Sequence, residues 1–99
     1  MSRTPQETID REIAESLRPS LKELGFYEEK TWNNSISFRT QINVTQAQHF
    51  SYGITANITI RSNAMVLHSA YGSWTIEYND PDFMIKITEF SQKGMLWHP

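Results

Sequence analysis

Histidine is the side chain most often used for acid–base catalysis and metal binding near neutral pH, and this 99-residue chain contains three, His49, His68 and His98. A metal site on a single element needs a second ligand about two residues away on a strand or four residues away on a helix. None of these histidines has a histidine, aspartate or glutamate at such a spacing. We therefore predict no metal, no bound cofactor and no catalytic histidine.

Carboxylates and nucleophile motifs also form no catalytic constellation. Asp80 and Asp82 flank Pro81, a combination typical of turns. Glu77 and Lys86 would form an ion pair across neighbouring strands if the segment between them is a tight turn. The four glycines are far apart, which excludes a glycine-rich phosphate loop, and no Gly-x-Ser-x-Gly motif occurs. These residues favour a non-enzymatic role.

Aromatic and short polar side chains are more informative. Aromatic residues at strand ends or in loops are typical of protein interfaces, and alternating segments place uncharged hydrogen-bonding groups on one face of the predicted sheet. The candidate partner-binding residues are Arg39, Gln41, Asn43, Phe50, Tyr52, Asn57, Arg61 and Tyr71. An ordinary solvated sheet face is the alternative interpretation, because threonine favours strands whatever their function.

An amphipathic helix is predicted at the N-terminus. Thr4, Pro5 and Glu7 combine a capping box with a proline in the first turn, and Gly25 suits the C-terminal cap. Pro19 predicts a kink or a break, with a second short helix after it. One apolar stripe runs along the helix and consists of Ile9, Ile13, Leu17, Leu21 and Leu24.

After the helix the apolar period changes from about four to two, which predicts half-buried antiparallel strands. A short strand is expected over residues 26–32, and residues 63–72 are assigned to a strand rather than a helical turn. The tail, residues 91–99, is either a frayed end or an apolar hook. Clear alternation covers residues 36–45, 54–61, 74–79 and 83–88. We predict an α+β fold, with the helix on a four- to five-stranded antiparallel meander.

Length and composition set the class of protein. Ninety-nine residues, 38% of them apolar, suit a single domain (1–99) with one modest core. The net charge of −2 and the scattered basic residues argue against nucleic-acid binding and membrane association. No stretch has the apolar length of a membrane span. The absence of cysteine excludes disulfides and thiolate metal sites, and it favours a cytoplasmic location.

One segment resembles a known family. The stretch Leu17-Arg18-Pro19-Ser20-Leu21-Lys22-Glu23-Leu24-Gly25-Phe26, followed by a tryptophan and alternating strands, is similar to the opening of a family of small bacterial domains of unknown function. Those domains begin with an L-x-P-x-L-K-x-x-G-F helix end and continue into a sheet. The resemblance covers the helix and the first strands, and it implies a fold but no activity.

Two functional hypotheses follow. The first is a small non-enzymatic interaction module of bacterial or phage type, such as an inhibitor, an immunity-like protein or an assembly factor. It would bind a protein partner through the sheet face or the aromatic loops. A homo-oligomer, such as a virion or assembly component, is a variant of this hypothesis. The alternative is a small ligand-binding or hydrolytic domain with a site between helix and sheet, where His68, Tyr71 or Asp80 would supply polar groups.

Overall fold

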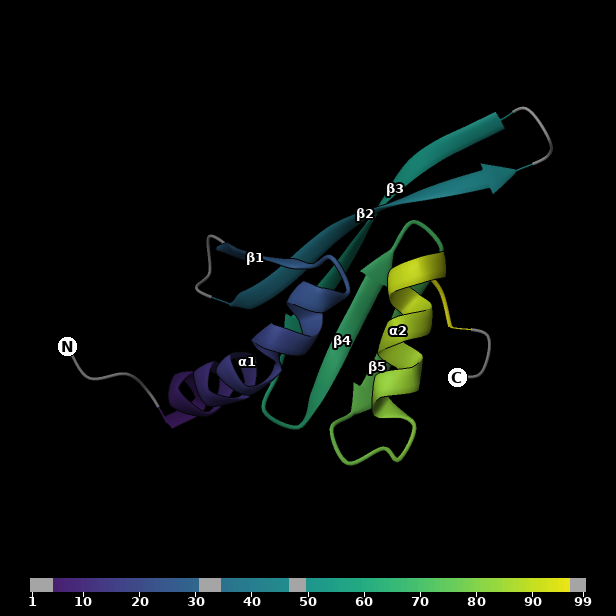
Figure 1. Cartoon of the computed structure of the whole chain (residues 1–99). Helices are drawn as coiled ribbons and strands as arrows, with labels where there is room; N and C mark the ends of the chain where they lie inside the picture. Colours follow the sequence, from purple (N-terminus) through teal and green to yellow (C-terminus); the bar gives the residue numbers. More distant parts are fainter. Residues whose placement is uncertain (1–4, 31–34, 47–49, 97–99) are drawn as a thin grey trace.

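A five-stranded antiparallel sheet is flanked in sequence by two helices in the computed structural model, which describes residues 5–30, 35–46 and 50–96 (Figure 1). The strands lie in the order β1-β2-β3-β4-β5, and each pairs with the next. The predicted α+β fold with an antiparallel meander is therefore confirmed. The elements are α1 (Pro5–Glu23), β1 (Tyr27–Lys30), β2 (Ile36–Gln46), β3 (Phe50–Ile60), β4 (Ala64–Ser69), β5 (Gly72–Glu77) and α2 (Phe83–Lys93).

Helix α1 begins at Pro5, the residue predicted for the first helical position, whereas the proposed cap Thr4 lies outside the described residues. The helix continues through Pro19, so the predicted break and second short helix are wrong, and a kink there stays a prediction. Ala14 and Leu21 lie before and after Pro19 and are both buried. Their packing on the sheet holds the two halves in one helix despite the poor helix propensity of proline.

The C-terminal end of α1 is closed by Gly25, as predicted. Its φ of 95° is in the left-handed region, which glycine adopts without steric cost. The Gly25 N–H donates to the Lys22 carbonyl (3.0 Å), and the Phe26 N–H donates to the Leu21 carbonyl (2.9 Å). These two bonds form a Schellman motif. Because Leu21 and Phe26 are both buried, the cap also brings the chain into the core just before β1.

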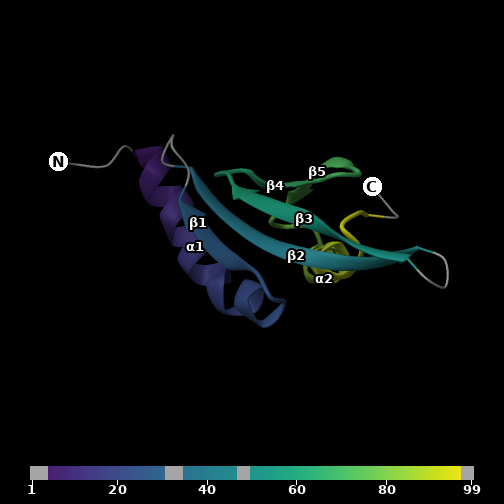
Figure 2. The same cartoon turned by 90° about the horizontal axis from the view of Figure 1, so that it is seen from above.

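Both helices pack on the same face of the sheet, and no described helix covers the other face (Figure 2). Along each strand, alternate side chains point towards the helices, as the period of two predicts. Ala14 and Leu21 of α1 join the same apolar cluster as the buried residues of α2. The sheet contributes Phe38, Ile42, Ile54, Ala56, Ile58, Ile60, Met65, Leu67 and Ile76 to this cluster.

The hairpin of β2 and β3 is longer than the rest of the sheet. Its register runs from Ser37–Thr59 to Gln46–Phe50, whereas β4 pairs with Asn57–Ile60. The far end of the hairpin therefore extends past the neighbouring strands (Figure 1). This extension contributes to the long dimension of the molecule, 54 Å against 30 and 23 Å.

Residues 83–88 are helical, so the strand predicted there is wrong. The buried side chains of α2 are spaced by four and three positions, which is the helical repeat. Ile85, which strand alternation would bury, is 66% exposed. Gly94 ends the helix with a φ of 71°. The buried residues of α2 are Phe83, Ile87 and Phe90.

The predicted ion pair between Glu77 and Lys86 is wrong for the same reason. Lys86 lies on α2, and its Nζ donates to Asp80 Oδ2 at 2.7 Å. Asp80 Oδ1 accepts from the Asp82 N–H at 2.8 Å. These contacts lower the pKa of Asp80, mainly through the bond from Lys86, and the same bond raises the pKa of Lys86. The turn residues therefore hold the start of a helix rather than a hairpin.

The described part of the tail folds back on the core as an apolar hook. Leu96 is 9% exposed and belongs to the core cluster. Gly94 lies against Ile54, and the Ser69 hydroxyl donates to the Gly94 carbonyl. The end of α2 is thereby fixed to β3 and to the end of β4.

Candidate functional site

The helix-free side of the sheet, which we name the open face, carries mostly polar side chains. Hydroxyl and amide groups dominate it because alternate strand positions are Thr, Ser and Asn. Register places on it Tyr27 and Glu29 of β1, Ser37, Arg39, Gln41 and Asn43 of β2, Thr55, Asn57 and Thr59 of β3, Val66 and His68 of β4, and Ser73, Thr75 and Glu77 of β5.

A row of side chains crosses the open face at right angles to the strands, and we name it the central row. Tyr27 lies opposite Arg39, and Arg39 lies opposite Asn57. His68 lies opposite Asn57 and also opposite Ser73. Opposite residues have Cβ atoms about 5 Å apart, so these side chains form an unbroken line of hydrogen-bonding groups over all five strands.

The β1 end of the central row combines an exposed aromatic ring with a guanidinium. Tyr27 is 54% exposed. Arg39 Nη1 donates to Glu29 Oε1 at 3.3 Å. Arg39 Nε is buried and makes no hydrogen bond within the described part of the chain. A partly exposed pair such as Arg39–Glu29 contributes only about 1 kcal/mol to stability, so its main effect is to orient the guanidinium beside Tyr27.

At the other end of the central row, His68 Nδ1 lies 2.6 Å from Ser73 Oγ. A serine beside a histidine is the starting point of nucleophilic catalysis, but that chemistry also needs a group that orients the imidazole and a site that excludes water. His68 and Ser73 are both exposed on a sheet surface. The pair therefore supplies the open face with donor and acceptor groups.

The predicted partner-binding residues divide into two groups. Arg39, Gln41, Asn43 and Asn57 lie on the open face, as the alternation implied. Arg61 follows the end of β3, is exposed, and has its Nη1 3.5 Å from Ser35 Oγ. These five residues could contact one partner together.

Tyr52 and Tyr71 form the second group. Tyr52 packs against the core on the helix side of β3, and its hydroxyl lies 2.6 Å from that of Tyr71, in the turn between β4 and β5. The bond with Tyr52 raises the pKa of Tyr71. Phe50 pairs with Gln46 at the end of the hairpin, and its side chain is not among those described. The aromatic residues therefore do not share a surface with the polar ones.

Sequence reasoning did not place three members of the central row, Tyr27, His68 and Ser73, on the polar face; it named His68 for the alternative site between helix and sheet. Tyr27 could have been found, because it occupies an alternate position of a strand that was predicted. His68 and Ser73 lay in or beside the segment whose structure was ambiguous, and only the pairing of β4 with β5 places them on the open face. Once 63–72 is assigned to a strand, the alternation from Val66 is the signal that would have found His68.

The structure does not bring together the polar groups of the alternative hypothesis. His68 is on the open face, Tyr71 is in the β4–β5 turn, and Asp80 is bonded to Lys86 beside α2. Buried apolar side chains occupy the contact between the helices and the sheet. Within the described ranges, no three His, Asp or Glu residues are grouped as a metal site would require.

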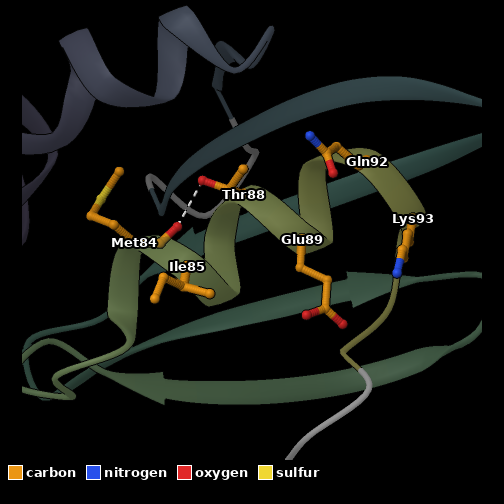
Figure 3. Close-up of a pocket in the computed structure, with 6 residues that line it drawn as sticks. All are labelled: Met84, Ile85, Thr88, Glu89, Gln92 and Lys93. Carbon is orange, nitrogen blue, oxygen red and sulfur yellow. Dashed lines mark hydrogen bonds between the residues drawn. The ribbon is translucent and has the colours of Figure 1, made fainter.

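One hollow lies on the outer side of α2, has a volume of about 460 Å³, and opens to solvent (Figure 3). Thr88 Oγ1 in its wall donates to the Met84 carbonyl at 2.7 Å. Sites for small molecules bury most of the ligand surface, which an open helix side does not do. The lining residues are Met84, Ile85, Thr88, Glu89, Gln92 and Lys93.

Comparisons with protein-family models, curated proteins and solved structures found no match to this chain. The resemblance of the segment ending at Phe26 to bacterial domains of unknown function therefore stays a prediction. No helix in the described residues has the length and apolar character needed to span a membrane. Function is inferred from the geometry of the open face.

Proposed function

We propose that this chain is a protein-interaction module that binds a partner protein through the open face, with Tyr27 and Arg39 as the main contacts. The observation that carries the proposal is the position of these two side chains. They are cross-strand neighbours on the face that no described helix covers. Tyrosine and arginine are strongly enriched among the residues that dominate binding energy at protein interfaces.

The charge distribution supports a polypeptide partner. The charged side chains of the open face and its border, Glu29, Arg39, Arg61 and Glu77, balance in sign. Nucleic-acid binding would need a surplus of basic groups to neutralise phosphates. A balanced surface of hydroxyl and amide groups can instead pair with the backbone and polar side chains of a protein, at about one hydrogen bond per 100–200 Å² of interface.

The biological setting belongs to the same proposal. A small, cysteine-free and slightly acidic domain of this kind suits a cytoplasmic inhibitor, immunity-like protein or assembly factor from a bacterium or a phage. Such proteins act by covering a surface of their partner, which requires an exposed recognition face and no catalytic group.

Site-specific photo-cross-linking in cells that naturally produce the chain tests the proposal. A cross-linking amino acid replaces Tyr27 in one variant and the exposed Lys22 of α1 in a matched control. The proposal expects one discrete adduct at position 27 and none at position 22. Adducts of equal yield at both positions, or none at either, would contradict it.

Substitution then tests whether Arg39 contributes to binding of the partner identified in that adduct. We expect Arg39→Ala to weaken binding at least about tenfold, whereas Arg11→Ala, on the exposed side of α1, leaves it unchanged. Arg39→Lys retains the charge but not the planar fork of donors, so it should restore binding only in part. Equal affinities for all variants would show that the open face is not the contact.

A further inference from the structure

The two edges of the sheet differ in how well they are protected against pairing with another strand. At one edge, β1 has only four residues, and Glu28, Glu29 and Lys30 give it three charges. At the other edge, β5 has six residues, Gly72–Glu77, with no proline and a single charge at its end. Short length and charge are the usual devices that block edge pairing. They are present on β1 and absent from β5.

We propose that β5 pairs antiparallel with β5 of a second copy of this chain, around a two-fold axis at Thr75. Two five-stranded sheets would thereby join into one continuous sheet with the helices of both copies on the same side. The proposal concerns a different surface from the open face, which stays uncovered in such a dimer. It therefore goes beyond the proposed function and can fail or succeed independently of it.

The residues of β5 are complementary to themselves about this axis. In a continuous sheet, paired residues must point to the same face. An axis between two residues would pair a residue with a neighbour that points to the other face, so the two-fold axis has to pass through a residue. With the axis at Thr75, Thr75 faces its own copy, Trp74 faces Ile76 of the second copy, and Ser73 faces Glu77. Thr–Thr and aromatic–β-branched pairs are among the favourable cross-strand combinations. Glu77, the one charged residue of the strand, therefore does not meet its own copy.

The same operation on β1 is unfavourable. A two-fold axis in the middle of that strand falls on Glu28 or on Glu29, and each choice places a carboxylate opposite its own copy. Like charges directly opposite one another destabilise a strand pair. Glu29 is also engaged by Arg39 within its own chain. Self-pairing is therefore specific to the β5 edge.

Single-cysteine variants test the register, because the chain has no cysteine of its own. Opposite residues in an antiparallel pair have Cα atoms about 4.5–5.5 Å apart, within the range of a disulfide. Under mild oxidation, Thr75→Cys should form a disulfide-linked dimer. Ser73→Cys is the matched control on the same strand and face, four positions from its own copy, and should stay monomeric. Equal cross-linking of both variants, or of neither, overturns the proposal.

Light scattering after size-exclusion chromatography tests the association of the unmodified chain. An edge contact is smaller than a standard interface, so dimers of 11.5 kDa chains should form with rising concentration. Thr75→Lys places two ammonium groups opposite each other and should weaken dimers roughly tenfold or more. Ser73→Lys faces Glu77 and should not weaken them.

Two results of the scattering experiment, and one of hydrogen exchange, overturn the proposal. One is a chain that is monomeric at all concentrations up to about 1 mM. Another is a dimer that Thr75→Lys leaves unchanged, since its contact must lie elsewhere. The third is a monomer whose β5 amides become protected from hydrogen exchange only when another protein is added, because that result assigns the edge to a foreign strand.

Discussion

At the scale of single residues, Gly94 occupies the most constrained position of the chain end. Its φ of 71° disfavours any L side chain, and a Cβ added there would lie 2.5 Å from Ile54 Cδ1. We predict that Gly94→Ala lowers the free energy of unfolding by about 2–4 kcal/mol, from the left-handed conformation and the clash together. The midpoint of urea unfolding measures the loss.

Gly53→Ala is the control for this substitution. Gly53 lies on the exposed part of β3, and a Cβ there would meet only Asn43 Oδ1, at 3.7 Å. Alanine restricts the unfolded chain more than glycine does, so this variant should be neutral or more stable by up to about 1 kcal/mol. If both variants lost the same stability, the loss at position 94 would be a general effect of replacing glycine by alanine rather than a result of the local geometry of Gly94.

Tyr78 gives a pH dependence at alkaline pH. Its hydroxyl donates to the Arg61 carbonyl at 2.6 Å, and burial raises the pKa of Tyr78 to about 12 from an ordinary 10.0. Between pH 10 and 12 the unfolded chain releases this proton while the folded chain retains it, so stability falls as the pH rises. We predict that this group removes up to about 2 kcal/mol across that window.

Tyr78→Phe identifies the part of the stability loss at alkaline pH that comes from this hydroxyl. The variant should be less stable at neutral pH by about 1–2 kcal/mol, because it lacks the hydrogen bonds to Arg61. The difference in free energy of unfolding between the variant and the original chain should then narrow as the pH rises from 10 to 12. Urea unfolding at each pH measures it. A gap that stays constant would show that Tyr78 does not titrate in this window.

The residues of the candidate site were only partly predictable. Alternation was enough to place Arg39, Gln41 and Asn57 on one face, because the side chains of a strand must alternate. It could not show that Arg39, Asn57 and His68 form one row, since that depends on the register between strands. Register is set by loop lengths and by the fit of whole faces, and neither can be obtained from one strand at a time.

At the scale of elements, α2 shows why a short apolar pattern is ambiguous. Phe83, Ile85 and Ile87 alternate as in a strand, whereas Phe83, Ile87 and Phe90 follow the helical repeat. The segment 83–87 alone fits a strand and a helix equally well. The residues that follow extend the helical spacing to Phe90. The structure agrees with the helix, because a buried strand would need Ile85 in the core, and that side chain is 66% exposed. The glycine at position 94 was a helix-end signal of the same kind as Gly25.

The start of α2 depends on charge, which gives a prediction at acid pH. The bond from Lys86 lowers the pKa of Asp80 below its ordinary 3.8. As the pH falls, the Asp80 carboxyl therefore takes up a proton in the unfolded chain before it does so in the folded chain. The stability that this group contributes above its ordinary pKa is lost as the pH drops through its pKa in the folded chain. We predict that Asp80→Asn loses less stability than the original chain between pH 5 and pH 2, by urea unfolding.

Lys86→Met tests whether the partner is the cause. Removal of the ammonium group should reduce the loss of stability at acid pH to a similar degree. The double variant, Asp80→Asn with Lys86→Met, should show no further reduction. If Lys86→Met left the acid dependence of the original chain intact, the carboxylate would be held by another contact.

At the scale of the whole molecule, the sheet separates stability from recognition. One face, together with two helices, forms the core, and the other face carries the central row. Fold class followed from alternation because burial on one face fixes the period of every strand. The order of the strands followed from the short connections, which favour pairing of neighbours in sequence. The length of the β2–β3 hairpin did not follow, because its extension depends on pairing that the apolar pattern does not encode.

This separation predicts opposite effects for neighbouring residues of β3. Ile58 is 0% exposed, so Ile58→Ala should lower the free energy of unfolding by about 2–5 kcal/mol. Asn57, next in the chain, points to the open face, and Asn57→Ala should change stability by less than about 1 kcal/mol. The affinity for the cross-linked partner should show the reverse. Asn57→Ala should weaken binding, whereas Ile58→Ala should leave it unchanged when it is measured at a temperature where this variant is still folded. The two residues are neighbours in the chain and point to opposite faces of the sheet. Equal loss of binding in both variants would therefore mean that recognition does not reside on the open face.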